Sequence, residues 1–252
     1  MKTCVKQMID DLKKLGVRVD DTLLVHSSFK SLGWSREEGT PDDALLALMS
    51  AVSEGTLMLP TLSYETVGAA NPFFSVADTP ACVGILPETF RKKEGVFRSG
   101  CATHSVAVWG KDAKEIADAH LLDETPVGDH SPFAAVRDRG GKILMLGCGL
   151  EPCTSMHGVE ELSRPDYLFG DPVVYTLTLA DGSTRKHTLL RHDFANTVQR
   201  YDRIEQYLSG DELRCQKVCG ATAYLIDAKA LWEKTDAVLR KDPHAFVDQT
   251  KD

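Results

Sequence analysis

Long hydrophobic segments are missing from this chain of 252 residues. No stretch approaches the roughly 20 consecutive apolar residues that a membrane-spanning helix needs. The first residues, MKTCVKQMIDDLKKLG, have the spacing of an amphipathic helix and not the composition of a signal peptide. The sequence therefore predicts a cytoplasmic protein without a membrane partner.

Basic side chains are also fewer than acidic ones. The 29 basic side chains are outnumbered by 37 acidic ones, which gives a formal net charge of −8. This balance argues against a nucleic-acid partner and favours a cationic small molecule. The seven cysteines, an odd number in a long chain, are atypical of a secreted disulfide framework, so we expect reduced thiols.

Several familiar motifs and any sign of a linker are absent. The sequence contains no Walker loop, no dinucleotide-binding glycine fingerprint and no nucleophile elbow. Internal repeats and low-complexity tracts are absent as well. We therefore expect a single domain over residues 1–252, whose function is not one of the common nucleotide-binding or hydrolase activities.

Short apolar runs alternate with helical patterns along the chain. TLLVH (22–26), TLMLP (56–60) and KILMLG (142–147) are compact runs typical of strands that are covered on both faces. The helical patterns include apolar positions at 3.6-residue spacing over 3–15 and the segment that begins at residue 41. This alternation predicts an α/β fold, with a central sheet flanked by helices.

Local signals predict where individual elements begin and end. Thr3 is expected to cap the first helix and Gly16 to end it, while Thr40 is expected to cap the helix that starts with Pro41. Two strand-like runs, PVVYTLTL and STRKHTLL, flank Ala180-Asp181-Gly182 and predict an added antiparallel hairpin. The sheet as a whole is therefore expected to be mixed.

Polar residues and histidines follow the predicted strands in four segments, 25–34, 59–64, 102–110 and 146–161. The ends of strands are where open α/β sheets usually bind ligands. In the first segment, VHSSFKSLGW, hydroxyls, backbone amides and a lysine can hold a phosphate or the amides of a pantetheine arm. The same residues are equally typical of a serine-rich turn that caps the following segment.

The segment LGCGLEPCTSMHGVEE gives the most specific chemical signal. Thr154 or Ser155 can cap a helix, on which His157 and Glu160 are neighbours because they are three residues apart. An imidazole in this position can serve as a general base near neutral pH. A histidine that is merely hydrogen-bonded in the core remains an alternative.

Cysteines near His157 suggest two other kinds of site. Cys148, Cys153, His157 and His104 raise the question of zinc, but the thiols are five residues apart and no second paired motif follows, so we expect no metal. Cys153 with His157 could instead act as nucleophile and base of a hydrolase. A buried, unreactive Cys153 is the simpler interpretation.

Seven segments in a fixed order carry a family resemblance. They are VHSSFKSLGW, GTLMLPTLSY, TPACVGILPETFRKKEGVFRS, THSVAVWG, SPFAAV, GKILMLGCG and TSMHGVEE. In this order they resemble the aminoglycoside 3-N-acetyltransferases, from about Asp20 to His157 and beyond, and GATAYLIDA near the end is also similar. The resemblance implies direct transfer of the acetyl group of acetyl-CoA to an amine, most specifically the 3-amino group of a 2-deoxystreptamine aminoglycoside.

The resemblance also implies roles for individual residues. His157 matches the family's catalytic histidine, and Glu160 matches the acidic residue three positions later. The turn that binds coenzyme A is matched by Ser27 and Ser28, followed by Lys30, Ser31 and Leu32. Ser105 matches the hydroxyl of the family's His-Ser element and is expected among the cofactor-binding residues, where it, or backbone amides near it, would stabilise the oxyanion of the reaction.

The remaining site residues follow from looser matches. The carboxylate that orients His157 is expected to be Asp193, in LRHD after the hairpin, with Glu160 as the alternative. Glu65 is the candidate for an acidic lining of the acceptor pocket, although a solvated loop position is equally compatible. Cys101-Ala102 replaces the family's usual His-Pro, and Cys153 replaces a common Asn. These departures concern the acceptor pocket, so another amine, or coenzyme A binding without turnover, remains an alternative.

Overall fold

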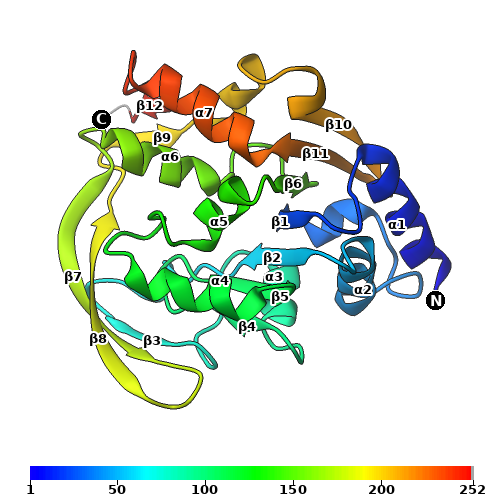
Figure 1. The fold of residues 1–252 in the computed structure, drawn as a ribbon, viewed down its shortest axis with the longest axis horizontal. Helices are drawn as coiled ribbons and strands as arrows, with labels where there is room; N and C mark the ends of the chain where they lie inside the picture. Colours follow the sequence, from blue (N-terminus) through cyan, green and yellow to red (C-terminus); the bar gives the residue numbers. More distant parts are fainter. Residues whose placement is uncertain (251–252) are drawn as a thin grey trace.

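The computed structural model of the chain describes residues 1–250, so residues 251–252 of the expected domain lie outside the described part. Its centre is a mixed sheet of seven strands (Figure 1). The order across the sheet is β10 (Leu213–Val218), β11 (Ala221–Asp227), β6 (Lys142–Leu146), β1 (Thr22–Ser27), β2 (Thr56–Pro60), β5 (Val106–Gly110) and β4 (Phe97–Arg98). Only the β6–β1 and β1–β2 pairings are parallel, and the other four are antiparallel.

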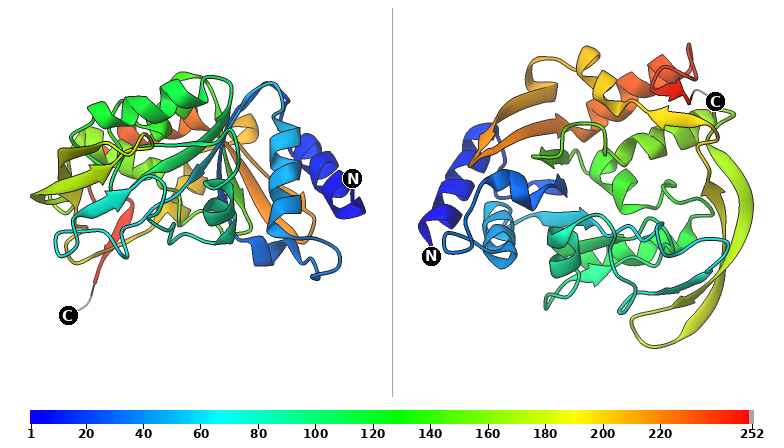
Figure 2. Two further views of the ribbon diagram at one scale, coloured as in Figure 1. Left: turned by 90° about the horizontal axis from the view of Figure 1, so that it is seen from below. Right: turned by 180° about the vertical axis from the view of Figure 1, so that it is seen from behind.

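Helices cover both faces of this sheet (Figure 2). One face carries α1 (Thr3–Leu15), α2 (Pro41–Ala51) and α3 (Ile85–Phe90). The other carries α4 (Ala113–Ala119), α5 (Pro132–Asp138), α6 (Ser155–Ser163) and α7 (Ala228–Leu239). Successive residues of β1 divide between the two layers, with Leu23 and Val25 in the first core and Leu24 in the second. The predicted α/β class with a mixed sheet is confirmed.

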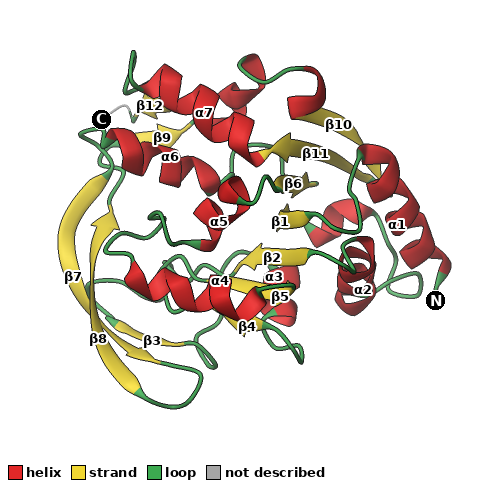
Figure 3. Cartoon of the chain, in the orientation of Figure 1, coloured by secondary structure: helices red, strands yellow, loops and turns green. Residues whose placement is uncertain are grey.

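A second, three-stranded sheet curves along one side of the molecule (Figure 3). It pairs β3 (Phe73–Ser75) with the long hairpin of β7 (Phe169–Thr178) and β8 (Thr184–His192). The predicted antiparallel hairpin is thereby confirmed. Two short strands, β9 (Thr197–Gln199) and β12 (Val247–Gln249), pair separately. Short 3₁₀ helices span Phe29–Leu32, His120–Leu122, Tyr201–Gln206 and Gly210–Glu212.

The capping predictions have a mixed outcome. Thr40 caps α2 in a capping box with Asp43, and Gly16 ends α1 with φ of 116°, a conformation that favours glycine. The prediction for Thr3 is wrong, because Thr3 is the first residue of α1 and Lys2 stands at the N-cap position, where its side chain makes no capping hydrogen bond. The ammonium group of Lys2 lies 2.8 Å from Asp43 of α2. Within residues 1–250, no helix is long and apolar enough to cross a membrane.

Candidate active site

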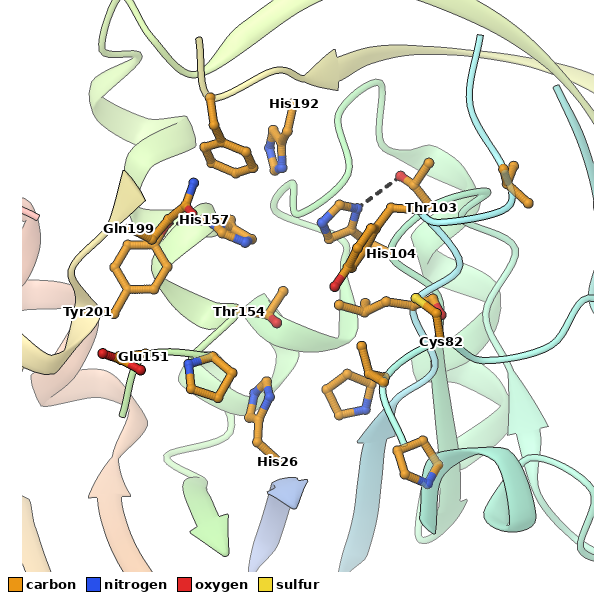
Figure 4. Close-up of a pocket in the computed structure, with 18 of the residues that line it drawn as sticks. His26, Cys82, Thr103, His104, Glu151, Thr154, His157, His192, Gln199 and Tyr201 are labelled. Atoms are coloured by element: carbon orange, nitrogen blue, oxygen red, sulfur yellow. Dashed lines mark hydrogen bonds between the residues drawn. The ribbon is translucent and has the colours of Figure 1, made fainter. Parts of the chain in front are cut away.

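A cavity of about 760 Å³ opens where three central strands end (Figure 4). His26 and Ser27 at the end of β1, Leu62 after β2 and Cys148 after β6 all line it. The opposite wall includes Tyr175 of β7, His192 of β8, and Gln199 and Tyr201 beyond the hairpin. All four segments expected to carry ligand-binding residues therefore meet here, as the rule for strand ends in α/β sheets predicts.

His157 lies in the first turn of α6 and lines this cavity. Its Nδ1 lies 2.7 Å from the Tyr201 hydroxyl and 3.3 Å from Oε2 of Glu160. The Tyr201 hydroxyl donates to the same Glu160 oxygen over 2.7 Å. Tyr201 thus connects the imidazole with the carboxylate and comes from a segment 44 residues further along the chain.

These contacts determine which nitrogen of His157 is free. Because the Tyr201 proton points to Glu160, the phenol oxygen accepts the hydrogen bond from His157 Nδ1–H. Burial, followed by the charge of Glu160, holds the pKa of Tyr201 well above its usual value, so the phenol keeps its proton. The neutral imidazole then has its lone pair on Nε2, as a general base requires.

Glu160 is held by a second tyrosine. Its side chain is completely buried, and Oε1 accepts a hydrogen bond of 2.8 Å from the Tyr167 hydroxyl. Two phenols and one imidazole therefore surround a carboxylate that has no exposure to solvent. A buried carboxylate needs such donors to offset its loss of hydration.

Three further histidines line the cavity. The ring centroids of His104, His157 and His192 are 5.1–5.8 Å apart, and His26 lies below them at the end of β1 (Figure 4). Burial lowers the pKa of His26 to about 3 and holds the pKa values of His104 and His192 well below their usual range. These three imidazoles are therefore neutral at physiological pH.

The structure brings Glu160, but not Asp193, to His157. The Asp193 carboxylate forms an ion pair of 2.6 Å with Arg191 and is 39% exposed. The choice of Asp193 is thus corrected, and the alternative stated with it, Glu160, is the carboxylate in contact with the imidazole. The cause is geometric, because Asp193 follows β8 and its neighbour His192 occupies the cavity wall.

Glu65 and Ser105 also lie outside the cavity lining. Glu65 is exposed, and the carboxylate that does line the cavity belongs to Glu151. The Ser105 hydroxyl is fully buried, donates to the carbonyl of Thr61 and accepts from Arg98 Nε. Ser105 therefore joins strands β2, β4 and β5, and its hydroxyl is not available to an oxyanion.

The serine turn after β1 is only partly exposed to the cavity. Ser27 lines it, and within residues 1–250 its buried Oγ has no hydrogen-bond partner. Ser31 Oγ is engaged by Ser28 and by the carbonyl of Gly147. Lys30 is exposed, while Leu32 is packed in the core around α1 and α2 and cannot present its side chain to a ligand.

The cysteines near His157 do not form a reactive centre. Cys153 is fully buried, is not part of the cavity lining, and burial raises the pKa of its thiol to about 12. Cys148 lines the cavity, but burial raises its pKa to about 11. A nucleophilic Cys153 is therefore disfavoured. In the described part of the chain, no three His, Cys, Asp or Glu side chains are grouped to hold a metal ion.

Sequence reasoning missed Tyr201, Tyr167 and His192 as site residues. Tyr201 and Tyr167 lie in segments without any motif, and only the fold brings their hydroxyls to Glu160. His192 lies beside Asp193, the residue that the sequence predicted to orient His157. Strand alternation gives no signal here, because the adjacent residues Arg191 and His192 both line the cavity and Asp193 lies beyond β8.

Comparison with known proteins identifies the class. A family model described as "Aminoglycoside 3-N-acetyltransferase" matches residues 24–240. The aminoglycoside N(3)-acetyltransferase IV of Salmonella sp is 30% identical over 248 residues, covering 96% of this chain and 89% of that protein. An SPbeta prophage-derived aminoglycoside N(3')-acetyltransferase-like protein of Bacillus subtilis is 31% identical, over 62% of this chain and 64% of its own length, which is less than two thirds.

Solved structures agree with these matches. The apoenzyme of aminoglycoside acetyltransferase AAC(3)-IVa has a TM-score of 0.79 at 28% identity, covering 98% of this chain and 92% of that one. A binary complex of AAC-IIIb with CoASH has the same fold, with a TM-score of 0.79 at 24% identity and coverage of 94% and 96%. Fold and relatives together define an acyltransferase. The chain belongs to the aminoglycoside 3-N-acetyltransferase family.

Proposed function

We propose that this chain transfers the acetyl group of acetyl-CoA to an amine of an aminoglycoside, at the 3-amino group of the 2-deoxystreptamine ring. The observation that carries the proposal is the His157–Tyr201–Glu160 chain at the wall of a cavity large enough for small-molecule substrates. A structure of an AAC(3)-IVa mutant, 28% identical to this chain, was solved in complex with gentamicin.

His157 is the general base of the proposed reaction. Its Nε2 takes a proton from the acceptor nitrogen as that nitrogen attacks the thioester carbonyl. The C–N bond forms, the C–S bond breaks, and the proton passes to the thiolate that leaves. Glu160, acting through Tyr201, orients the imidazole of His157. While this imidazole holds the proton, Glu160 also stabilises its positive charge.

The start of α6 replaces Ser105 as the proposed site of oxyanion stabilisation. Thr154, the residue before α6, lines the cavity and its side chain makes no capping hydrogen bond. The positive end of the helix dipole and the free Thr154 hydroxyl therefore face the region in which His157 acts. In other enzymes a single oxyanion donor contributes about 2.7–4 kcal/mol to transition-state stabilisation.

Coenzyme A is proposed to bind along the β1 side of the cavity. Ser27 Oγ is a buried hydroxyl without a partner in the described chain, which suits a hydrogen bond to a pantetheine amide. Ser28, Lys30 and Ser31 are proposed to contribute to the turn that receives the cofactor, whereas Leu32 only anchors this turn in the core.

The remaining expectations keep the status of proposals. We propose that residues 1–252 form one domain, that no metal takes part and that the protein acts in the cytoplasm on a cationic amine. Resistance to aminoglycosides is the proposed biological role.

The proposed function is tested by the reaction itself. Purified protein is incubated with acetyl-CoA and gentamicin or sisomicin, and the release of free thiol is recorded. We expect thiol release that depends on the aminoglycoside, and NMR of the product should place the acetyl group on the 3-amino nitrogen. Thiol release that is the same with and without any amine would instead indicate hydrolysis and overturn the proposal.

A further inference from the structure

Helix α6 carries two consecutive carboxylates, and each one holds a different histidine of the cavity. Glu160 contacts His157, directly and through Tyr201. Glu161 Oε1 lies 2.7 Å from Nε2 of His192. The rings of His157 and His192 are 5.3 Å apart, and both line the same cavity (Figure 4). The proposed mechanism uses only the first of these two carboxylate–histidine pairs.

The surroundings of Glu161 determine which nitrogen of His192 is free. Besides His192, this carboxylate accepts hydrogen bonds from the Thr125 hydroxyl and from the backbone N–H of Val127. The Thr125 hydroxyl and the Val127 N–H favour the ionised form of Glu161, which prevails above the pKa of about 7 that burial gives this carboxyl group; in that range Nε2 of His192 carries the proton. Nδ1 therefore has the lone pair, and within residues 1–250 it has no hydrogen-bond partner although the side chain is only 3% exposed.

The Glu161–His192 pair is suited to take up a proton near neutral pH. Burial raises the pKa of Glu161 to about 7, while burial and the neighbouring His157 hold the pKa of His192 well below its usual value. The pair with ionised Glu161 and neutral His192 thus has one buried negative charge, and the addition of one proton to the pair neutralises this charge. The titratable and charged groups near the pair are His104 and His157 beside the ring of His192, Arg164, which lowers the pKa of Glu161, and Asp123 and Cys101, whose pKa values are raised by burial and further by the charge of Glu161. Arg191 and Asp193, on either side of His192, neutralise each other.

The proton balance of amine acetylation leaves a task for a second base. Aliphatic amines are mostly protonated near pH 7, as the lysine pKa of about 10.4 illustrates. An ammonium group and a thioester give an amide, a thiol and one free proton. The nitrogen loses two protons: the thiolate receives one by way of His157, and the other must leave before the nitrogen has an electron pair for the attack.

We propose that His192 is this second base: its Nδ1, with Glu161 behind the ring, takes the first proton from the bound ammonium group. The N–H bond of the ammonium breaks, its electron pair stays on the amine nitrogen, and a new N–H bond forms at His192. The proton later passes to solvent, which restores the pair. This inference rests on the proposed function and adds a further catalytic residue to it.

The test compares His192→Gln with the wild type at several pH values. Glutamine can still donate to Glu161 but is not a base. The wild type can use the protonated amine, whereas the variant depends on the fraction already deprotonated in solution. The ratio of wild-type to variant kcat/KM for sisomicin should therefore increase by about tenfold per pH unit as the pH falls from about 9 to about 7, while the amine stays mainly protonated.

His187→Gln is the matched control. His187 lies on the same strand, its Nε2 donates to the carbonyl of Asp123, its Nδ1 also has no partner in the described chain, and it does not line the cavity. Any activity change in this variant should be independent of pH. A second measurement uses His192→Ala, in which added imidazole should restore turnover by about tenfold or more, with a larger effect at low pH.

Each outcome decides between two claims. If the wild type turns over sisomicin but the wild-type to His192→Gln ratio is the same at all pH values, or imidazole restores nothing in His192→Ala, the second-base proposal is wrong and the proposed function stands. If the wild type releases no thiol with sisomicin, the aminoglycoside function fails and this inference fails with it.

Discussion

At the scale of single residues, the phenol of Tyr201 is the contact on which the orientation of His157 depends. Tyr201→Phe removes the hydrogen bonds to both His157 and Glu160. We expect kcat to fall by about tenfold, equivalent to about 1.4 kcal/mol of transition-state stabilisation, with little change in KM.

Tyr167→Phe provides the control for this prediction. Tyr167 also donates to Glu160, through the other carboxylate oxygen, but no contact joins it to His157 in the described structure. Steady-state kinetics should show a clearly smaller loss of kcat in this variant. Equal losses in the two variants would mean that the phenols only support Glu160 and that Tyr201 does not orient the base.

The residues that the sequence could identify are those close together in the chain. His157 and Glu160 are neighbours on α6 by helical spacing alone, and the structure places them 3.3 Å apart. The choice of Asp193 failed by one residue, because His192 lines the cavity whereas the Asp193 carboxylate pairs with Arg191 and is 39% exposed. Tyr201 could not have been identified, because its contact depends on how distant segments pack.

At the scale of elements, the position of α6 matters most because it carries both histidine-binding carboxylates. Gly158 lies within α6, and a Cβ at this position would be 2.3 Å from Cη2 of Trp232 on α7 and 3.0 Å from a methyl group of Val127. The absence of a side chain therefore permits the close packing of α6 against α7. The buried indole is 3% exposed and has little room to move.

Gly158→Ala should accordingly be destabilising. Alanine improves helix propensity by about 1 kcal/mol, but overpacking in a core costs about 1–3 kcal/mol, and a contact of 2.3 Å is at the severe end. We expect a net loss of about 1–2 kcal/mol in the free energy of unfolding, measured by urea denaturation, and reduced turnover. Adding Trp232→Phe should recover part of the loss, and a double mutant that is no better than additive would contradict the packing argument.

The elements themselves were largely predictable, and the exceptions have local causes. The strands β1, β2 and β6 are short apolar runs buried on both faces, which is the pattern that the sequence shows. The predicted start of α1 was wrong by one residue, because Thr3 is already helical and no side chain caps this helix. Leu32 was assigned to ligand binding by its place in a motif, whereas burial assigns it to the core.

At the scale of the whole molecule, the net charge favours a cationic acceptor, while the cavity lining contains Glu151 and also Arg191, which is paired with Asp193. The chain has a net charge of −8, and Glu151 is a carboxylate of the cavity lining. If this charge attracts the acceptor, KM for gentamicin should rise with ionic strength, because at 0.1 M salt charges more than about 10 Å apart are largely screened. Glu151→Gln should raise KM and flatten its salt dependence.

Glu65→Gln is the matched variant for this prediction, since it removes the same charge from an exposed position outside the cavity lining. We expect it to change KM less than Glu151→Gln does, because both carboxylates are exposed but only Glu151 lines the cavity. Initial rates of both variants, measured at low and high salt, give the KM values for this comparison. Equal effects of the two substitutions would show that only overall charge matters and that Glu151 does not contact the acceptor.

The most direct test of the central claim is the turnover of His157→Ala, measured as thiol release from acetyl-CoA with gentamicin as acceptor. Removal of a general base should lower kcat by about 100-fold or more. The affinity for coenzyme A, measured by calorimetry on the same preparation, should change little, because the imidazole acts on the acceptor proton and not on the cofactor. Wild-type turnover in this variant would contradict the account, since no other cavity histidine is joined to Glu160 within residues 1–250.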